Sequence, residues 1–454
     1  MLAFLYRLGW AAARPLAAPL GRLRGKLGRG IRGRRASVPT LSAWAARARR
    51  PGVPLVWFHA ASVGEGRQAE AVLRRLKSAR PDWQLAYTFS SPSAERLAAS
   101  LPADVAAYAP FDTVRDVEGA LEALRPTAIV FAATDVWPEL AVRAAAGGVA
   151  LALVSATLAP TSSRRGALAR RLLAPAYAAL GAVGAIDAAD ARGLEDLGVR
   201  PSAVTITGDT RHDAAITRLA AADRAAPHLR ALAAEAADAP PIVLAGSTWP
   251  ADEQALVPAL GALQARGVRF RAVIAPHEPT PRHLAALEQR LRADLGTGAA
   301  VVRLSSLLSP GNLEPPATGY LPSGNWDAVI IDQVGLLAEL YMTASFAYVG
   351  GGFHGAGLHS VIEPAAAGVP VLFGPRHEGS RDARLLLEAG AARAAGDAGD
   401  LDRAHEDWLG NETARAAAGA AARAVVERGK GAAERSLQMV IALVERFLTP
   451  MSTH

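Results

Sequence analysis

Short apolar runs alternate with amphipathic stretches along the chain from residue 51 onward. Before residue 210 the pattern gives seven runs that we expect to form strands: VPLVWFHA (53–60), QLAYTFS (84–90), DVAAYAP (104–110), AIVFAA (128–133), VALALVSA (149–156), AVGAI (182–186) and AVTITG (203–208). Most of the intervening stretches carry apolar residues at helical spacing, as GRQAEAVLRRLKSARP does after the first run. Continuous apolar strands separated by helices are typical of a parallel sheet that is covered on both faces.

A second series of apolar runs follows an Ala-rich, Pro-punctuated stretch. Its members are PIVLAGS (241–247), FRAVIAP (270–276), AVVRL (300–304), AVIID (328–332), FAYVGGG (346–352) and PVLFGP (370–375). We therefore expect an α/β fold with two doubly wound parallel-sheet domains, at 51–222 and 241–428, and a linker at 223–240. A chain of 454 residues, of which 51% are hydrophobic, is long enough for each domain to bury its own core. The absence of cysteine excludes a disulfide framework, a thiolate metal site and a cysteine nucleophile.

The positive charge of the chain is concentrated near its N-terminus. The formal net charge is +7, yet residues 1–50 hold twelve Lys or Arg and no Asp or Glu, so the rest of the chain carries a net charge of −5. This distribution argues against a nucleic-acid channel through the folded domains. It favours one basic segment that contacts an anionic surface.

Residues 1–50 are expected to associate with a membrane surface without crossing the membrane. No uninterrupted apolar run approaches the ~20 residues that span a bilayer. Arg7 and Arg14 share one helical face, which suits a helix lying in the interface with Tyr6 and Trp10 at the level of the lipid headgroups. A secretory signal and a solvated basic tail are the alternative interpretations.

Polar residues mark the points where several strands are expected to end. In open parallel sheets, ligands bind at the carboxyl ends of the strands. The marked residues are His59, Ser62, Gly64 and Glu65 in WFHAASVGEG, Gly246, Ser247 and Thr248 in AGSTWPADE, and His277 and Glu278 in APHEP. Ser62 and Thr248 are also ordinary helix N-caps, and the backbone N–H groups of a helix start can bind an anion.

A glycine-rich stretch, VGGGFHGAGLHSVIEP (349–364), follows the fifth strand of the second series. Gly350, Gly352 and Gly355 match the dinucleotide fingerprint G-x-G-x-x-G, but no acidic residue ends the next strand to hold a ribose, and no Walker loop occurs in the chain. We instead expect a loop whose N–H groups approach a phosphate. Glu363, in the short helix that follows, is placed to accept both hydroxyls of a ribose.

Five features together resemble one glycosyltransferase family. They are ASVGE (61–65), TDVWPE (134–139), AGST (245–248), the stretch from GGG to HSVIEPAAAGVPVLFGP (350–375) and the basic N-terminal segment. In their order and spacing they resemble the lipid A Kdo transferases, which move 3-deoxy-D-manno-octulosonic acid (Kdo) from CMP-Kdo onto a lipid A precursor. The resemblance implies the GT-B fold, with two Rossmann-like domains that face a cleft. It also implies a C-terminal helix, within 429–454, that packs back on the N-terminal domain.

The resemblance further implies an inverting, metal-independent enzyme with no cofactor, which uses CMP-Kdo as its donor substrate. Its partners would be the lipid A precursor and the anionic surface of the inner membrane, to whose cytoplasmic face it would be peripherally or shallowly attached. No nucleic-acid partner is implied.

The resemblance assigns roles to residues at matching positions, beginning with Glu65 as the catalytic base. The matching CMP-binding residues are Gly246, Ser247, Thr248, His277, Gly350, Gly351, Gly352, His359, Ser360 and Glu363. The residues expected in the acceptor site or cleft are Ser62, Gly64, Asp135 and Arg211. The departures from the family pattern are Ala133 and Asp135 in place of glutamates, Ser360 in place of asparagine, Arg211 in place of lysine and His277 in place of arginine.

The chemistry of glycosyl transfer also favours Glu65 as a general base. A sugar hydroxyl that attacks an anomeric carbon needs a carboxylate to take its proton. The competing interpretation of Glu65 is a carboxylate at a helix N-terminus that the helix dipole favours.

Metal binding is not expected, and three classes of function remain. His354, His359, His377 and Glu378 lie in loops without helical i, i+4 pairing, and Asp400-Leu401-Asp402 falls in an expected solvated loop. The first hypothesis is a Kdo transferase, or another GT-B enzyme that uses a different nucleotide sugar and a lipid-linked acceptor. The others are a dinucleotide oxidoreductase and a catalytically inactive membrane-bound scaffold.

Overall fold

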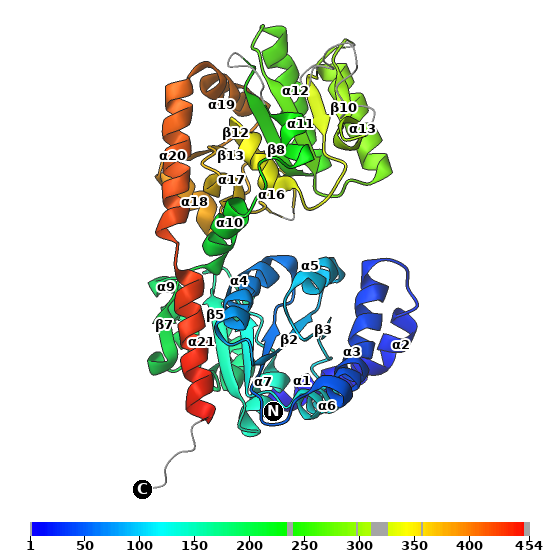
Figure 1. Cartoon of the computed structure of the whole chain (residues 1–454), viewed down its shortest axis with the longest axis vertical. Helices are drawn as coiled ribbons and strands as arrows, with labels where there is room; N and C mark the ends of the chain where they lie inside the picture. Colours follow the sequence, from blue (N-terminus) through cyan, green and yellow to red (C-terminus); the bar gives the residue numbers. More distant parts are fainter. Residues whose placement is uncertain (1, 234–238, 297, 310–325, 356, 449–454) are drawn as a thin grey trace. The chain divides into compact units, whose positions relative to one another are not determined.

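The computed structural model describes residues 2–233, 239–296, 298–309, 326–355 and 357–448. The chain divides into two compact units, unit 1 (Met1–Ala214 with Gly429–His454) and unit 2 (Ala215–Arg428) (Figure 1). It passes from unit 1 to unit 2 within helix α10 (Thr210–Ala220) and returns between α20 (Glu412–Arg428) and α21 (Ala432–Leu448). Each unit is a Rossmann-like α/β domain built around one parallel sheet.

Unit 1 contains a seven-stranded sheet in the order β3-β2-β1-β4-β5-β6-β7, and all neighbouring strands are parallel. The strands are β1 (Leu55–His59), β2 (Gln84–Phe89), β3 (Val105–Tyr108), β4 (Ala128–Ala132), β5 (Ala150–Ala156), β6 (Ala182–Ala185) and β7 (Val204–Ile206). Each coincides with an apolar run that the sequence predicted as a strand. From the central pair β1 and β4, the chain winds outward in both directions.

The helices of unit 1, besides α21, surround this sheet. They are α1 (Leu2–Ala13), α2 (Ala17–Leu20), α3 (Lys26–Ala48), α4 (Val63–Ala79), α5 (Glu95–Ser100), α6 (Val114–Leu124), α7 (Pro138–Ala146), α8 (Ala167–Ala178) and α9 (Ala188–Asp196). Short 3-10 helices are η1 (Arg14–Leu16), η2 (Pro92–Ala94), η3 (Ser163–Arg165) and η4 (Pro201–Ala203).

Both faces of the unit 1 sheet are buried, which explains why its strands are continuous apolar runs. In β1, Leu55 and Trp57 join the core on one face, while Val56 and Phe58 join the core on the other. Residues of α3, α6 and α7 cover the first face, and residues of α4 and α21 cover the second. Figure 1 shows α21, in red, alongside α4 and β5, which it contacts.

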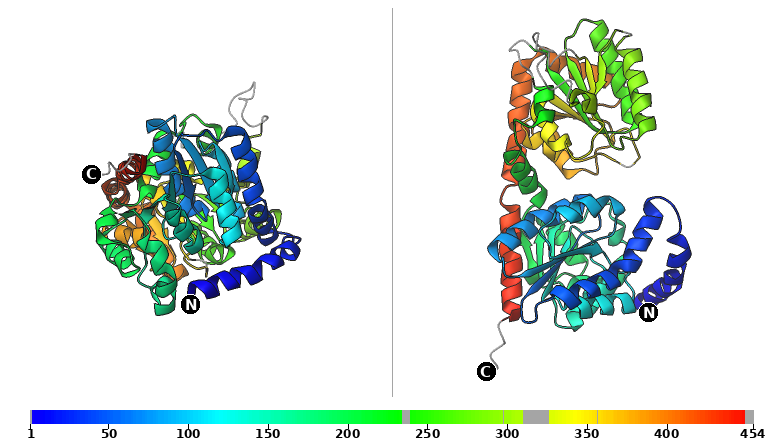
Figure 2. Two further views of the ribbon diagram at one scale, coloured as in Figure 1. Left: turned by 90° about the horizontal axis from the view of Figure 1, so that it is seen from below. Right: turned by 45° about the vertical axis from the view of Figure 1, so that its right-hand side comes forward.

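The basic N-terminal segment forms α1, α2 and α3, and much of it packs on the rest of unit 1 (Figure 2). Arg7 Nε donates to Glu139 Oε2 at 2.8 Å, and Arg14 Nε donates to Asp116 Oδ2 at 2.7 Å. These two cations therefore neutralise carboxylates of unit 1 and do not mark a lipid-facing side of the helix.

Tyr6 and Trp10 also turn toward the protein. Tyr6 Oη donates to Asp112 Oδ2 at 2.7 Å, and the ring centroid of Trp10 lies 6.1 Å from that of Trp137. The predicted position of Tyr6 and Trp10 at the lipid headgroups is therefore wrong. Amphipathic aromatic residues are favoured at membrane interfaces, but here a buried carboxylate and neighbouring rings supply the polar and apolar partners.

Phe4, Leu5 and Leu8 form an exposed apolar row on the same helix, with 66%, 51% and 54% of their surface exposed. Among the described residues, no helix combines the length and the apolar character that crossing a bilayer requires.

Unit 2 contains a second seven-stranded parallel sheet, in the order β10-β11-β9-β8-β12-β13-β14. The strands are β8 (Ile242–Thr248), β9 (Arg271–Pro276), β10 (Val301–Arg303), β11 (Ala328–Ile330), β12 (Phe346–Val349), β13 (Val371–Phe373) and β14 (Ala392–Ala394). All but β14 coincide with predicted runs. The sequence around β14 is too short and too rich in alanine to stand out as a strand.

The helices of unit 2, besides α10 and α20, are α11 (Pro227–Leu232), α12 (Pro250–Ala265), α13 (Pro281–Asp294), α14 (Leu304–Leu307), α16 (Leu337–Leu340), α17 (Ile362–Ala366), α18 (Arg381–Glu388) and α19 (Ala398–Gly410), with the 3-10 helix η5 (Tyr341–Thr343). The expected linker 223–240 contains α11, whose Leu229 and Leu232 are buried in the core of unit 2. This part of the linker prediction is wrong, since two core leucines were hidden in an Ala-rich stretch. Residues 234–238 lie outside the described part of the chain.

Candidate active site

The candidate site of unit 1 lies where the strand order of its sheet reverses. At such a switch point the connections that follow two neighbouring strands leave in opposite directions, and a ligand crevice forms at their carboxyl ends. In unit 1 the two strands are β1 and β4. Glu65 follows β1 and Asp135 follows β4, so the fold brings to this point two residues that are far apart in the sequence.

Glu65 is held at the start of α4 by a capping box. Ser62 is the N-cap, and its hydroxyl accepts from the Glu65 backbone N–H at 3.4 Å. In return, Glu65 Oε2 accepts from the Ser62 backbone N–H at 3.0 Å and from the Ser62 hydroxyl at 3.1 Å. Glu65 Oε1 has no hydrogen-bond partner among the described residues. One oxygen therefore fixes the carboxylate, and the other is open to a ligand.

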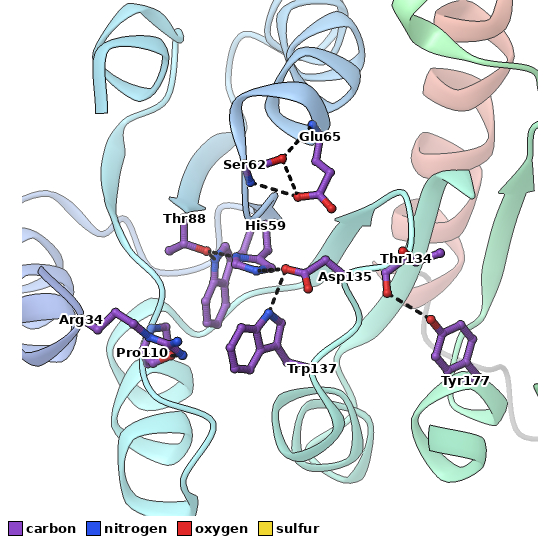
Figure 3. A network of polar contacts seen from close by, with 11 residues as sticks. Arg34, His59, Ser62, Glu65, Thr88, Pro110, Thr134, Asp135, Trp137 and Tyr177 are labelled. Atoms are coloured by element: carbon purple, nitrogen blue, oxygen red, sulfur yellow. Dashed lines mark hydrogen bonds and ion pairs between the residues drawn. The ribbon is translucent and has the colours of Figure 1, made fainter. Parts of the chain in front are cut away.

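Asp135 is positioned by a polar network that reaches into the core (Figure 3). Its Oδ2 lies 3.0 Å from His59 Nε2 and accepts from Trp137 Nε1 at 3.0 Å. His59 Nδ1 lies 2.9 Å from Thr88 Oγ1, which accepts from Trp57 Nε1 at 2.8 Å. Because an ionised carboxylate only accepts, His59 donates to Asp135 through Nε2.

The two carboxylates of this site have opposite pKa shifts. Burial raises the pKa of Glu65, and the negative charge of Asp135 raises it further, against the hydrogen bonds from Ser62. Burial also acts to raise the pKa of Asp135, but the hydrogen bonds from His59 and Trp137 and the charge of His59 outweigh it and lower that pKa. Glu65 is therefore the more basic of the two, as a proton acceptor requires.

The other residues expected around the acceptor lie in different settings. Gly64 is exposed within the first turn of α4. Arg211, in α10, donates from Nε to Asp209 Oδ2 at 2.9 Å, so its guanidinium pairs with a neighbouring carboxylate. Ala133, directly after β4, has a φ of 57°, a left-handed conformation that is rare for a residue with a side chain and that recurs at functional sites.

The corresponding switch point of unit 2 lies between β8 and β12. Ser247 in β8 has a φ of 55°, and the pairing of β8 with β9 shifts register between Gly246 and Thr248. This irregularity ends the strand just before α12. The glycine-rich loop after β12 lies beside the same point of the fold. The predicted donor-site residues after β8, β9 and β12 therefore share one edge of the sheet.

The three glycines of that loop are required by the protein's own backbone. A Cβ added at Gly350, Gly351 or Gly352 would lie 2.2, 2.1 or 2.4 Å from backbone atoms of neighbouring segments. Gly350 N–H donates to Gly246 O at 2.9 Å, and Gly351 N–H donates to Asp252 Oδ2 at 2.8 Å. The expectation that these two N–H groups meet a phosphate is therefore wrong, because both are already bonded.

Asp252 is the buried anchor of the glycine loop. Its Oδ1 accepts from Tyr348 Oη at 2.9 Å and from the Phe353 N–H at 3.1 Å. Its Oδ2 accepts from the Gly351 N–H and, at 2.9 Å, from the Trp249 N–H. With both oxygens engaged and no exposed surface, Asp252 has a structural role.

Four rings gather beside the glycine loop. The ring of Trp249 lies 4.2 Å from that of His354, with 6° between their planes, and 4.6 Å from that of His277. His277 stacks in turn on His359 at 4.5 Å, and Trp249 Nε1 donates to His359 Nε2 at 3.0 Å. Burial lowers the pKa of His359 to about 4, and the neighbouring His277 lowers it as well.

Glu363 and Ser360 lie at and just before the start of α17, with Ser360 exposed and Glu363 half-buried. Burial raises the pKa of the Tyr341 hydroxyl, and the negative charge of Glu363 adds to this effect, which places the two groups near one another. A Cβ at Gly246 would lie 2.1 Å from Tyr341 Oη. Gly246 is therefore needed to admit this buried ring.

No group of three or more metal-binding side chains is gathered within the described residues. Asp400 and Asp402 were predicted to lie in a solvated loop. This prediction is wrong, because both residues lie in α19. Arg266 donates to both oxygens of Asp402, at 2.8 and 2.9 Å, which gives this carboxylate a structural partner.

Comparison with known proteins places this chain among its relatives. The 3-deoxy-D-manno-octulosonic acid transferase of Bordetella pertussis is 32% identical over 403 residues, which make up 86% of this chain and 88% of that protein. The chain belongs to the 3-deoxy-D-manno-octulosonic acid transferase family. The model of the family described as "3-Deoxy-D-manno-octulosonic-acid transferase (kdotransferase)" matches residues 31–214. A Kdo transferase family member from Haemophilus influenzae is 24% identical over 86% of this chain and 87% of its own length.

Solved structures of other enzymes share the fold of this Kdo transferase family member. A UDP-GlcNAc 2-epimerase from Neisseria meningitidis matches with a TM-score of 0.57 at 13% identity, over 86% of this chain and 99% of that chain. Acinetobacter baumannii MurG matches with a TM-score of 0.52 at 15% identity, over the same shares. At these identities the likeness concerns the fold alone, which is of the GT-B type.

No role was predicted from the sequence for Thr88, Trp249 or Asp252, and Trp137 was recognised only as part of the motif TDVWPE (134–139). Thr88 sits near the end of an apolar strand and carries no turn signal, so its contact with His59 depends on strand register. Trp249 and Asp252 hold the N-cap and N3 positions of α12. Their position directly after a strand was the signal that could have identified Trp249 and Asp252 as candidate site residues.

Proposed function

We propose that this chain transfers Kdo from CMP-Kdo to a lipid A precursor, with Glu65 as the general base. Membership of the Kdo transferase family supports the sugar, the donor and the acceptor. The observation that carries the role of Glu65 is its carboxylate geometry: Oε2 is fixed by Ser62, while Oε1 is open at the switch point of unit 1.

In this reaction an acceptor hydroxyl attacks the anomeric carbon of Kdo. The new glycosidic bond forms as the bond from that carbon to the phosphate oxygen of CMP breaks, so the electron pair leaves with CMP. Glu65 Oε1 takes the proton of the attacking hydroxyl. A single displacement of this kind inverts the anomeric configuration, and it calls for neither a metal ion nor a cofactor.

The donor site in this proposal lies at the switch point of unit 2. Glu363 would bind the ribose hydroxyls, and Gly352, Ser360 and His359 would lie along the nucleotide. The other proposed CMP-binding residues share that sheet edge: Gly246, Ser247, Thr248 and His277. Gly350 and Gly351 would shape the loop without contacting the phosphate, because their N–H groups bond to the protein.

Attachment to the membrane is proposed to be peripheral, at the cytoplasmic face of the inner membrane. The exposed row Phe4, Leu5 and Leu8 supplies an apolar surface for the headgroup boundary. Arg22, Arg24 and Lys26 follow in the same N-terminal segment, which carries no acidic residue, and such cations attract acidic lipid headgroups.

A panel of donors tests the proposal. The purified full chain, with the lipid A precursor present, is incubated separately with CMP-Kdo, with a set of UDP-sugars and with NAD(P)H. We expect consumption of CMP-Kdo alone. Consumption of a UDP-sugar would favour the alternative, another GT-B glycosyltransferase with a lipid-linked acceptor, and consumption of NAD(P)H would favour an oxidoreductase.

A further inference from the structure

The four-ring cluster in unit 2 (Trp249, His277, His354 and His359) contains a hydrogen bond that fixes a protonation state. Trp249 Nε1 lies 3.0 Å from His359 Nε2. An indole N–H can only donate, so His359 Nε2 must be the acceptor and carry no hydrogen. A neutral imidazole with a bare Nε2 carries its hydrogen on Nδ1.

Both partners of this hydrogen bond are anchored from the backbone. Trp249 N–H donates to the buried carboxylate of Asp252, and His359 N–H donates to Gly350 O at 3.0 Å. The indole is also stacked on two imidazoles, His354 and His277, at 4.2 and 4.6 Å. The His359 ring stacks in turn on His277 at 4.5 Å, so stacking restrains both rings of the hydrogen bond.

The second nitrogen of His359 is left available. His359 Nδ1 has no hydrogen-bond partner among the described residues, and it is not among the buried polar atoms that lack one. With its hydrogen on Nδ1, the ring presents an open N–H donor at the edge of the sheet where β8, β9 and β12 end. A donor of this kind is matched by an anionic oxygen, such as one of a nucleoside monophosphate.

We propose that Trp249 is a positioning residue that holds His359 as the neutral Nδ1–H tautomer, so that this N–H donates to an oxygen of the bound nucleotide. The nucleotide rests on the proposed function, whereas the tautomer rests on the geometry alone. Burial of His359 among other imidazoles disfavours its charged form, which agrees with a neutral donor.

The tautomer is measured in the full chain by nitrogen NMR with ¹⁵N-labelled histidine. The ten histidines give ring signals that distinguish protonated from bare nitrogens, and His359→Asn identifies the signals of His359 by their loss. We expect a protonated Nδ1 and a bare Nε2 at neutral pH. A protonated Nε2 on His359 in the unmodified chain would overturn the proposal.

Trp249→Phe keeps an aromatic ring in the stack but removes the N–H donor. We expect His359 to lose its single tautomer and to show a mixture of both forms. Trp326→Phe is the matched control, because Trp326 is also buried in unit 2 and its Nε1 has no partner among the described residues. A His359 tautomer unchanged by Trp249→Phe, or changed equally by Trp326→Phe, would contradict the positioning role. If Trp249→Phe fails to fold, benzothienylalanine at position 249, in which sulfur replaces the N–H, gives the same test.

Calorimetry with CMP tests the ligand. We expect Trp249→Phe to weaken CMP binding about three- to tenfold, as for loss of one well-oriented hydrogen bond, while Trp326→Phe leaves it unchanged. Equal CMP affinity in Trp249→Phe and the unmodified chain would contradict the proposed hydrogen bond from His359 to the nucleotide. Absence of CMP binding by the unmodified chain would instead overturn the proposed donor, and the NMR result would still decide the tautomer.

Discussion

Glu65 and Asp252 occupy the same position, N3, in helices that follow the first strand of each unit. Their surroundings differ. Asp252 has both oxygens engaged by four donors, including two loop N–H groups, and has no exposed surface. Glu65 has one oxygen in the capping box and one open. Sequence position alone makes these two carboxylates equivalent, and only the hydrogen-bond pattern separates a structural anchor from a candidate base.

Glu65→Gln is expected to lower turnover ~100- to 10,000-fold while leaving CMP binding nearly unchanged, since a general base acts mainly in the transition state. Gln keeps the size of the side chain and can still accept from Ser62. Steady-state kinetics with CMP-Kdo and calorimetry with CMP measure the two effects. Asp400→Asn is the control, because Asp400 holds the same N3 position in α19. Near-normal turnover of Glu65→Gln would leave Glu65 with a capping role only.

Asp135→Asn is expected to shift the pH dependence of turnover. Glu65 must be ionised to act, so turnover falls as the pH drops through its raised pKa. Removing the Asp135 charge lowers that pKa, which moves the acid limb of the profile to lower pH and weakens the base on the plateau. Asn can still accept from His59 and Trp137. A pH–rate profile tests this, with Asp196→Asn on α9 as an exposed control. An acid limb at the same pH in Asp135→Asn would show that Asp135 does not raise the pKa of Glu65.

Glu363→Gln is expected to weaken CMP binding tenfold or more, because a charged acceptor of two ribose hydroxyls contributes about 1.5–3 kcal/mol. Calorimetry with CMP on both proteins measures the difference. Glu388→Gln on α18 removes an exposed carboxylate of the same unit and serves as the control. Equal affinity for CMP would place Glu363 outside the donor site.

At the scale of elements, the glycine loop after β12 shows where sequence reasoning stops. The sequence located the loop and showed that a close approach required its glycines, but it could not identify the approaching group. That group is the protein's own backbone, together with Asp252 from the start of α12. The partner lies about a hundred residues away in the chain, so no local pattern reveals it.

For helix α1, too, the sequence did not reveal the partners of its side chains. Basic and aromatic residues of α1 and the adjoining η1 were predicted to face lipid. Instead, Tyr6 and Arg7 of α1 and Arg14 of η1 bind carboxylates that lie more than a hundred residues further along the chain. The exposed large apolar residues of α1 are Phe4, Leu5 and Leu8. The helix is therefore docked by its polar face and offers a narrower surface for a membrane than its sequence suggests.

Changing Phe4, Leu5 and Leu8 together to Ser is expected to lower binding to anionic vesicles more than tenfold, because burying each large apolar side chain contributes about 1.5–3 kcal/mol. The docking contacts of α1 are untouched, so the thermal midpoint is expected to stay the same. Vesicle co-sedimentation measures the binding. A double Phe447→Ser and Leu448→Ser variant is the control, since these residues are exposed on α21. Undiminished sedimentation of the α1 variant would exclude the apolar row as the attachment surface.

At the scale of the whole molecule, the periodic pattern was enough to predict the two parallel sheets. Long apolar runs such as that of β5 must be buried on both faces, so their structure is decided locally. β14 was missed because three residues with one alanine at each end give no such signal. α11 was hidden by Ala-rich composition. The candidate site was predicted in part, because Glu65 lies in a motif, while the positioning of Asp135 depends on His59 and Trp137 through contacts that only the fold creates.

The most direct test of the proposed activity is a transfer reaction with the full chain, CMP-Kdo and a lipid A precursor in detergent micelles. Mass spectrometry follows the lipid, and a coupled assay follows released CMP. We expect a lipid that gains Kdo, with one CMP released for each Kdo attached. Release of CMP with an unchanged lipid, or no reaction of CMP-Kdo under conditions where the Bordetella pertussis relative is active, would contradict it.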